Sequence, residues 1–166
     1  KMETGLIQIN KKKLPLMDTV ISAVNCTYPK ADEKEIEFVF DYAKELETCM
    51  VMQDKRWLGE AVINVLDNAI KFSPENGTIT MFLRHENDSV QFILEDEGPG
   101  IADDAKARIF DKFYQVDGSH KAEGNGLGLA LVKRIVDIAG GTIKAENREY
   151  GGCRFVVELP IKNYNE

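Results

Sequence analysis

The segment from residue 54 to residue 73 constrains the fold more than any other part of the chain. It predicts a helix in which apolar side chains cover most of the circumference: Val62, Ile63, Val65, Leu66, Ala69 and Ile70. Asp54 is a good N-cap for this helix, and Pro74 ends it after Ser73. A helix that is apolar on most sides packs inside a protein. We therefore expect a long helix that is largely buried.

One polar stripe interrupts this apolar surface. Glu60, Asn64, Asn68 and Lys71 follow one another at helical spacing. A buried amide without a partner costs about 1–3 kcal/mol, so the two asparagines need partners. Amide oxygens are suitable ligands for a hard cation such as Mg²⁺, and a lysine can bind phosphate. The alternative interpretation is a solvated stripe on an amphipathic helix.

A first glycine cluster follows an apolar strand predicted over residues 90–95. Asp96 comes directly after this strand, and Gly98 and Gly100 follow it. A carboxylate at this position can accept a hydrogen bond from an exocyclic amine. Glycines allow the backbone to approach a flat ring closely. The cluster is therefore suited to bind a flat ring that carries an amine.

A second glycine cluster opens a helix predicted over residues 127–139. Gly124, Gly126 and Gly128 supply backbone N–H groups where the helix dipole is positive, which suits phosphate. The cluster does not follow a strand, and its spacing fits the dinucleotide-binding pattern poorly. The phosphate loop Gly-x-x-x-x-Gly-Lys-Ser/Thr is absent from the sequence.

The remaining elements indicate a single α+β domain. Residues 78–84 and 90–95 predict one hairpin, and residues 142–146 and 154–159 predict another. A helix begins near Asp18 and is expected to end at Pro29 and the charged residues after it. Further strands are predicted at residues 6–10, 36–40 and 49–52. We expect two layers, with helices on one face of a mixed, mostly antiparallel sheet.

Charge and cysteine content narrow the possible partners. The formal net charge of −7 argues against a broad surface for nucleic acid or for anionic membranes. The negative net charge does not exclude the binding of one polyphosphate, because such a site needs only local N–H groups and a cation. Three widely spaced cysteines and no long apolar run favour a reducing compartment, so we expect a cytoplasmic domain. The parent protein could still carry a membrane anchor.

Four motifs, in this order, resemble the ATP-binding catalytic domain of bacterial-type sensor histidine kinases. Residues 64–74 (NVLDNAIKFSP) resemble its asparagine box, and residues 96–101 (DEGPGI) its first glycine box. Residues 109–114 (IFDKFY) resemble the phenylalanine box, and residues 124–129 (GNGLGL) the second glycine box. The resemblance implies the Bergerat-type ATP-binding fold shared with gyrase B, Hsp90 and MutL.

The resemblance also implies roles for individual residues, with ATP and Mg²⁺ as the bound groups. Asn64 holds Mg²⁺, and Asn68 contacts the metal or the phosphates. Lys71 contacts phosphate, and Phe72 flanks the adenine. Asp96 binds the adenine amino group. Residues 115–124 are implied to form a lid over the triphosphate. The remaining nucleotide contacts are implied for residues of the two glycine boxes and for residues next to the lid: Gly98, Gly100, Lys112, Gly124, Gly126, Leu127 and Gly128.

Some positions depart from the family pattern. Gln115 stands where many members have arginine, so either Lys112 or Lys121 is expected to contact the γ-phosphate. Cys153 stands where threonine or serine is frequent, which weakens a hydroxyl contact near the adenine.

The resemblance further implies a partner outside this chain. The phosphoacceptor of the family is a histidine on a separate dimerisation domain, and a response regulator receives the phosphoryl group afterwards. Residues 1–5 are expected to be the tail of that dimerisation region, residues 6–163 the catalytic domain, and the fragment a monomer. An ATP-hydrolysing switch of the gyrase and MutL kind is the alternative, because Glu60 stands four residues before Asn64 and could activate water.

Overall fold

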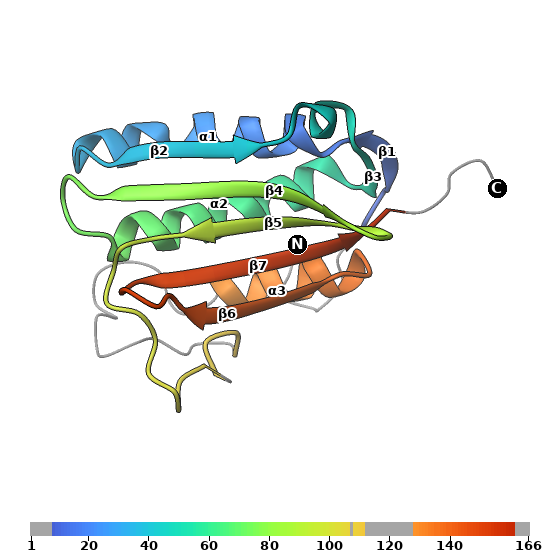
Figure 1. Cartoon of the computed structure of the whole chain (residues 1–166). Helices are drawn as coiled ribbons and strands as arrows, with labels where there is room; N and C mark the ends of the chain where they lie inside the picture. Colours follow the sequence, from blue (N-terminus) through green and yellow to red (C-terminus); the bar gives the residue numbers. More distant parts are fainter. Residues whose placement is uncertain (1–7, 107, 112–127, 162–166) are drawn as a thin grey trace.

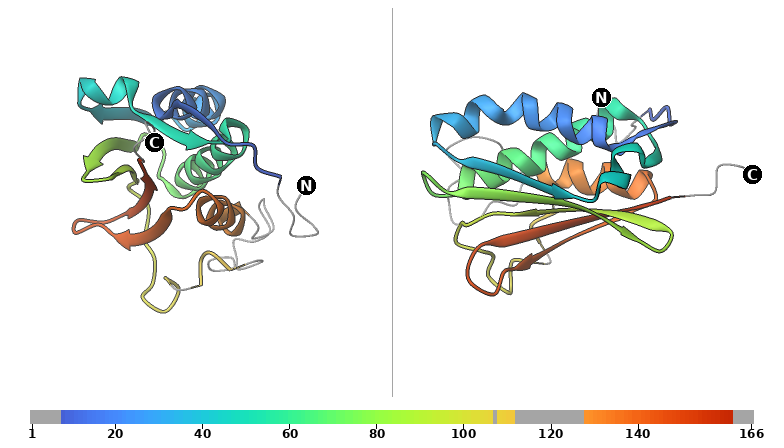
Figure 2. Two further views of the ribbon diagram at one scale, coloured as in Figure 1. Left: turned by 90° about the vertical axis from the view of Figure 1, so that its right-hand side faces the viewer. Right: turned by 45° about the horizontal axis from the view of Figure 1, so that its top comes forward.

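The computed structural model describes residues 8–106, 108–111 and 128–161 of the chain. Helices cover one face of a five-stranded sheet and leave the other face open (Figures 1 and 2). The helices are α1 (Leu16–Glu33), α2 (Lys55–Phe72) and α3 (Gly128–Ile138). The strands, in their order across the sheet, are β2 (Glu37–Tyr42), β4 (Thr78–Glu86), β5 (Ser89–Glu95), β7 (Cys153–Pro160) and β6 (Thr142–Asn147).

The pairing of these strands confirms the predicted fold class. Strands β2 and β4 are parallel, and the other three pairs in the sheet are antiparallel. Both predicted hairpins, β4–β5 and β6–β7, are present. Beside the helix layer lies a small antiparallel sheet of β1 (Lys12–Pro15) and β3 (Met50–Gln53), and the short 3₁₀ helix η1 (Lys44–Thr48) precedes β3.

The core lies between the sheet and the three helices because strand residues alternate between the two faces. On the central strand β5, Val90, Phe92 and Leu94 face the helices and are at most 3% exposed. Leu66 on α2 is completely buried beneath them. Helix α2 is therefore the buried helix that its composition predicts.

Both ends of α2 are held by side chains. Oδ1 of Asp54 accepts hydrogen bonds from the backbone N–H groups of Arg56 (3.1 Å) and Trp57 (3.3 Å), which confirms the predicted N-cap. At the other end, Nζ of Lys34 donates to the backbone carbonyls of residues 70, 71 and 73 at 2.8, 3.3 and 2.6 Å. These bonds satisfy carbonyls that a helix end leaves without partners.

Two predicted boundaries are wrong. Residues 8–10 have no regular structure, and the N-terminal strand lies later, at Lys12–Pro15. Helix α1 also continues through Pro29 to Glu33. Pro29 has no N–H to donate to the Asn25 carbonyl, but both residues are exposed. The fully buried Ala31 packs the last turn of the helix against the core.

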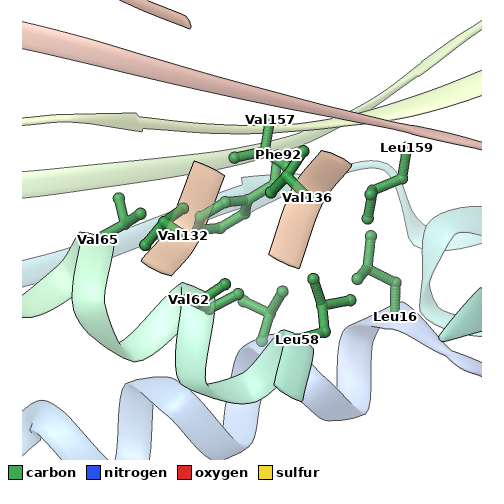
Figure 3. A pocket seen from close by; sticks show the side chains of 11 residues that line it. Leu16, Leu58, Val62, Val65, Phe92, Val132, Val136, Val157 and Leu159 are labelled. Carbon is green, nitrogen blue, oxygen red and sulfur yellow. The ribbon is translucent and has the colours of Figure 1, made fainter. Parts of the chain in front are cut away.

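A small cavity of about 10 Å³ lies between the helix layer and the sheet. Figure 3 shows side chains that line it. Side chains from all three helices and from β5 and β7 line it, among them Leu16, Val62, Phe92, Val132 and Val157. Its lining is entirely apolar, so it offers no hydrogen-bond partner to a water molecule. The cavity is a packing gap of the core and not a ligand site.

Gly59 provides a test of how α2 is packed. A Cβ atom added to Gly59 would have no other atom within 4 Å, and the residue lies in the helix interior. We expect Gly59→Ala to raise the free energy of unfolding by about 0.5–1 kcal/mol, because glycine is entropically unfavourable in helices. Urea denaturation measures the change; a loss of stability would contradict this packing.

The structure also bears on membrane insertion. None of the helices in residues 8–106, 108–111 and 128–161 is long and apolar enough to cross a membrane.

Candidate nucleotide-binding site

The second half of α2, the segment after β5 and the beginning of α3 meet at one end of the molecule. The Asn64 amide on α2 lies opposite the beginning of α3: a Cβ atom added to Gly128 would be 3.4 Å from Oδ1 of Asn64. Nδ2 of Asn64 donates to the Glu60 carbonyl at 2.9 Å, so its Oδ1 is left facing the N-terminus of α3. Two of the motifs recognised in the sequence are therefore adjacent.

Asp96 is a buried carboxylate at the end of β5, with 3% of its surface exposed. Its Oδ1 accepts hydrogen bonds from the backbone N–H groups of Gly98 (2.9 Å) and Cys153 (3.1 Å). Oδ2 has no hydrogen bond from any residue that the structure describes. One oxygen therefore fixes the orientation of the carboxylate, and the other can accept a bond from a ligand.

Burial raises the pKa of Asp96 above its usual range, because the charged form is poorly solvated there. The two backbone hydrogen bonds and the positive charge of Arg148 act in the opposite direction. The neighbouring Cys153 has its pKa raised to about 12 by burial and by the charge of Asp96. Its thiol is therefore protonated at neutral pH, and Cys153 contributes its backbone N–H rather than a thiolate.

Gly98 joins this segment to the end of α2. A Cβ atom on Gly98 would lie 2.6 Å from the Phe72 carbonyl oxygen, which is too close for a side chain. Only glycine therefore allows the two backbone segments to approach this closely. This contact places Phe72 and Lys71 next to the Asp96 segment. Nζ of Lys71 lies 5.3 Å from the centre of the Phe72 ring.

The predicted residues on α2 occupy one side of the helix, as their spacing predicts. Asn64, Asn68, Lys71 and Phe72 are all half-buried, whereas Glu60 is exposed. The Asn68 amide has no hydrogen-bond partner among the described residues, which leaves it available to a ligand. The stripe is therefore neither fully solvated nor satisfied by the surrounding fold.

Several predicted contact residues lie outside the part of the chain that the structure describes. They are Lys112, Gly124, Gly126 and Leu127, together with the whole predicted lid over residues 115–124, which includes Lys121. Phe110 of the phenylalanine box is described, and it packs edge-on against Phe155 with the ring centres 6.2 Å apart.

Two residues that the sequence analysis missed hold the Asp96 segment from the end of β6. Asn147 donates to the Ile101 carbonyl (2.8 Å) and accepts from the Ile101 N–H (2.7 Å). Arg148 donates from Nη1 to the Asp96 carbonyl at 2.7 Å. They lie about 50 positions from their partners in the sequence, so only the strand order reveals the contacts.

The donor set fits Mg²⁺ held mainly by phosphates. No group of three His, Cys, Asp or Glu side chains converges within the described residues. Mg²⁺ in nucleotide sites keeps several waters and takes one or two protein ligands besides phosphate oxygens. The Asn64 amide oxygen, turned toward the N-terminus of α3, is suited to be such a ligand.

Comparisons with known proteins agree with this geometry. The model of the histidine kinase-, DNA gyrase B-, and HSP90-like ATPase family matches residues 53–163. Hybrid signal transduction histidine kinase D of Dictyostelium discoideum is 33% identical, over 97% of this chain and 11% of that protein. The chain spans between 11% and 31% of the length of the curated relatives that it matches best.

Solved structures share the fold. ShkA, a full-length protein in complex with AMPPNP, is 31% identical with a TM-score of 0.80, over 93% of this chain and 32% of that chain. Histidine kinase ThkA, in complex with the response regulator protein TrrA, is 26% identical with a TM-score of 0.79, over 95% and 44% of the two chains.

The fold and the site together define an ATPase-type nucleotide-binding domain. The chain belongs to the histidine kinase-, DNA gyrase B-, and HSP90-like ATPase family.

Proposed function

We propose that the chain is the catalytic domain of a two-component sensor histidine kinase. It binds ATP with Mg²⁺, and the γ-phosphoryl group is transferred to a histidine on the dimerisation domain of the same parent protein. The observation that supports this most directly is the Asp96 carboxylate, which keeps Oδ2 available at the end of β5 to accept a hydrogen bond from the adenine amine. Membership of the ATPase family and the likeness to ThkA support it further.

In this proposal the chain contributes positioning and charge. Asp96 binds the base, Phe72 flanks it, Lys71 binds phosphate oxygens, and Asn68 binds the metal or the phosphates. Asn64 holds Mg²⁺, which when bound offsets the negative charge of the phosphates. The acceptor imidazole is the nucleophile and comes from outside the catalytic domain, so no covalent step falls to this chain.

The partners in the pathway are also part of the proposal. The solved complex of ThkA with TrrA supports a response regulator as the later phosphoryl acceptor. A dimerisation domain, a monomeric catalytic fragment and a cytoplasmic location remain predictions.

The gyrase-like alternative rests on Glu60, which precedes Asn64 by one helical turn and is exposed. Its carboxylate has no partner among the described residues and could activate water. The two functions differ in what accepts the phosphoryl group. Rapid ATP hydrolysis that Glu60→Gln abolishes would support the switch. Negligible hydrolysis, together with transfer to an added dimerisation domain, would support the kinase.

Asn64→Ala tests the metal site. We expect the substitution to remove the tightening of ATP binding by Mg²⁺, because the amide oxygen that completes the metal shell is gone. An effect of about tenfold on the dissociation constant should fall to nearly none. Calorimetric titration with ATP, with and without Mg²⁺, measures it.

Asn25→Ala is the matched control, because Asn25 is an exposed asparagine on α1, far along the chain from the site. It should retain the full Mg²⁺ effect. The metal assignment is wrong if Asn64→Ala also retains it.

A further inference from the structure

The C-terminal end of β6 holds the proposed adenine-binding segment at both of its ends. Arg148 bonds the carbonyl of Asp96 at the beginning of the segment. Asn147 makes two bonds to Ile101 at its end. Between them lies Gly100, whose φ of +86° places a would-be Cβ 2.8 Å from Oδ1 of Asn147. The path of the segment is therefore determined by two residues of a neighbouring hairpin.

Arg148 is itself held in place. Its backbone N–H donates to the Gly152 carbonyl at 3.0 Å, which closes the turn between β6 and β7. Its Nε lies 3.6 Å from Oε1 of Glu95, the residue before Asp96. The Arg148 side chain is 28% exposed, and the Glu95 side chain that it pairs with is 15% exposed. It thus contacts two successive residues at the end of β5.

We infer that Arg148 is a positioning residue for adenine recognition. It fixes the Asp96–Glu97 peptide and thereby the direction in which the Asp96 carboxylate presents Oδ2 to the base. This inference rests on the proposed function, since it takes Asp96 to be the residue that binds the adenine amine.

The charge of Arg148 reinforces the geometry. It lowers the pKa of Asp96 against the larger effect of burial. Among the described residues, Glu97 also acts on Asp96 and raises its pKa. The neighbours of Asp96, Cys153 and Glu95, interact in turn with the charged groups of Arg154 and Lys106. Without Arg148 the pKa of Asp96 rises further, so the ionised acceptor is lost at a higher pH than in the wild-type chain.

Arg154 offers a matched control. It also pairs with Glu95, through a 2.7 Å contact, and with Glu146 at 3.3 Å. It makes no hydrogen bond to Asp96. Arg154→Gln therefore removes a charge of the same ion-pair network and leaves the Asp96 carbonyl bonded.

The experiment compares Mg²⁺-bound ATP with purine-riboside triphosphate, in which a hydrogen replaces the adenine amine. We expect Arg148→Gln to weaken ATP by about five- to tenfold and the amine-free nucleotide by less than about twofold. The pH below which ATP affinity falls should move upward. Arg148→Lys should restore part of the preference, and Arg154→Gln should behave like the wild-type chain. Dissociation constants between pH 5 and 8 give all of these readouts.

Two other outcomes separate the inference from the proposed function. Equal weakening of both nucleotides by Arg148→Gln, or no weakening of either, overturns the role of Arg148. If Asp96→Asn leaves the preference for ATP unchanged, the assignment of Asp96 itself fails. If Asp96→Asn removes the preference and Arg148→Gln does not, the proposed function stands and only this inference is lost.

Discussion

Asp96→Asn is expected to weaken ATP binding on the order of 100-fold while leaving the fold intact. Asparagine retains the oxygen that accepts the N–H groups of Gly98 and Cys153. The group that replaces Oδ2 is an NH₂, which donates where the adenine amine also donates. Titration calorimetry with ATP measures the loss.

Although Asp96→Asn weakens ATP binding, it should not lower the thermal stability of the chain. The folded-state pKa of Asp96 is raised, so the charged side chain reduces stability once the pH exceeds the carboxyl's unfolded-state pKa. Asp96→Asn should therefore match the wild-type chain in acid and be at least as stable at neutral pH. A lower melting temperature at neutral pH would show that the carboxylate is needed by the fold.

Glu97→Gln is the control for this prediction. Glu97 is the adjacent carboxylate, and its Oε1 accepts the Thr78 N–H at 2.9 Å, a bond that glutamine can also make. It should change ATP affinity by less than about twofold. Comparable losses in the two variants would indicate a general charge effect instead of base recognition.

Gly152→Ala is expected to destabilise the chain clearly more than Gly151→Ala, the neighbouring substitution in the β6–β7 turn. Gly151 and Gly152 both have positive φ, of +108° and +98°. A Cβ on Gly152 would lie 2.0 Å from the Asp96 carbonyl oxygen, whereas one on Gly151 would have no atom within 4 Å. Positive φ costs alanine about 1–2 kcal/mol at either position. The overlap adds about 1–3 kcal/mol at Gly152 only.

Urea denaturation of the two variants separates the contributions. Gly152→Ala should unfold at clearly lower urea than Gly151→Ala and should also bind ATP more weakly, because Asp96 must shift. Equal midpoints for the two variants would contradict the close approach of the β6–β7 turn to the Asp96 carbonyl.

Local patterns in the sequence were sufficient to predict most of the fold. Asp54 and Pro74 mark the ends of α2, and the alternation along residues 90–95 marks the central strand. The strand before α1 was misplaced because its pairing with β3 is a contact between distant segments. The end of α1 was misplaced because burial of Ala31 outweighs the effect of an exposed Pro29.

A site residue could be predicted only where a side chain suited to the ligand stands at a recognisable position in a helix or strand pattern. Asn64, Asn68 and Lys71 are an amide and lysine stripe on an apolar helix, and Asp96 is a carboxylate at a strand end. Arg148 has no such local signal. Its role depends on the order β5–β7–β6, which brings the last hairpin beside Asp96.

The ammonium group of Lys34 at the end of α2 has an electrostatic consequence for the proposed site. A helix carries a partial negative charge at its C-terminus, and α2 ends at Lys71 and Phe72, where an ATP polyanion is proposed to bind. Left alone, those carbonyls would repel phosphate and attract the Lys71 ammonium group. Lys34 donates hydrogen bonds to three carbonyls at this end, and its positive charge offsets their partial negative charge. The positive charge of Lys71 is then available to interact with the phosphates of the nucleotide.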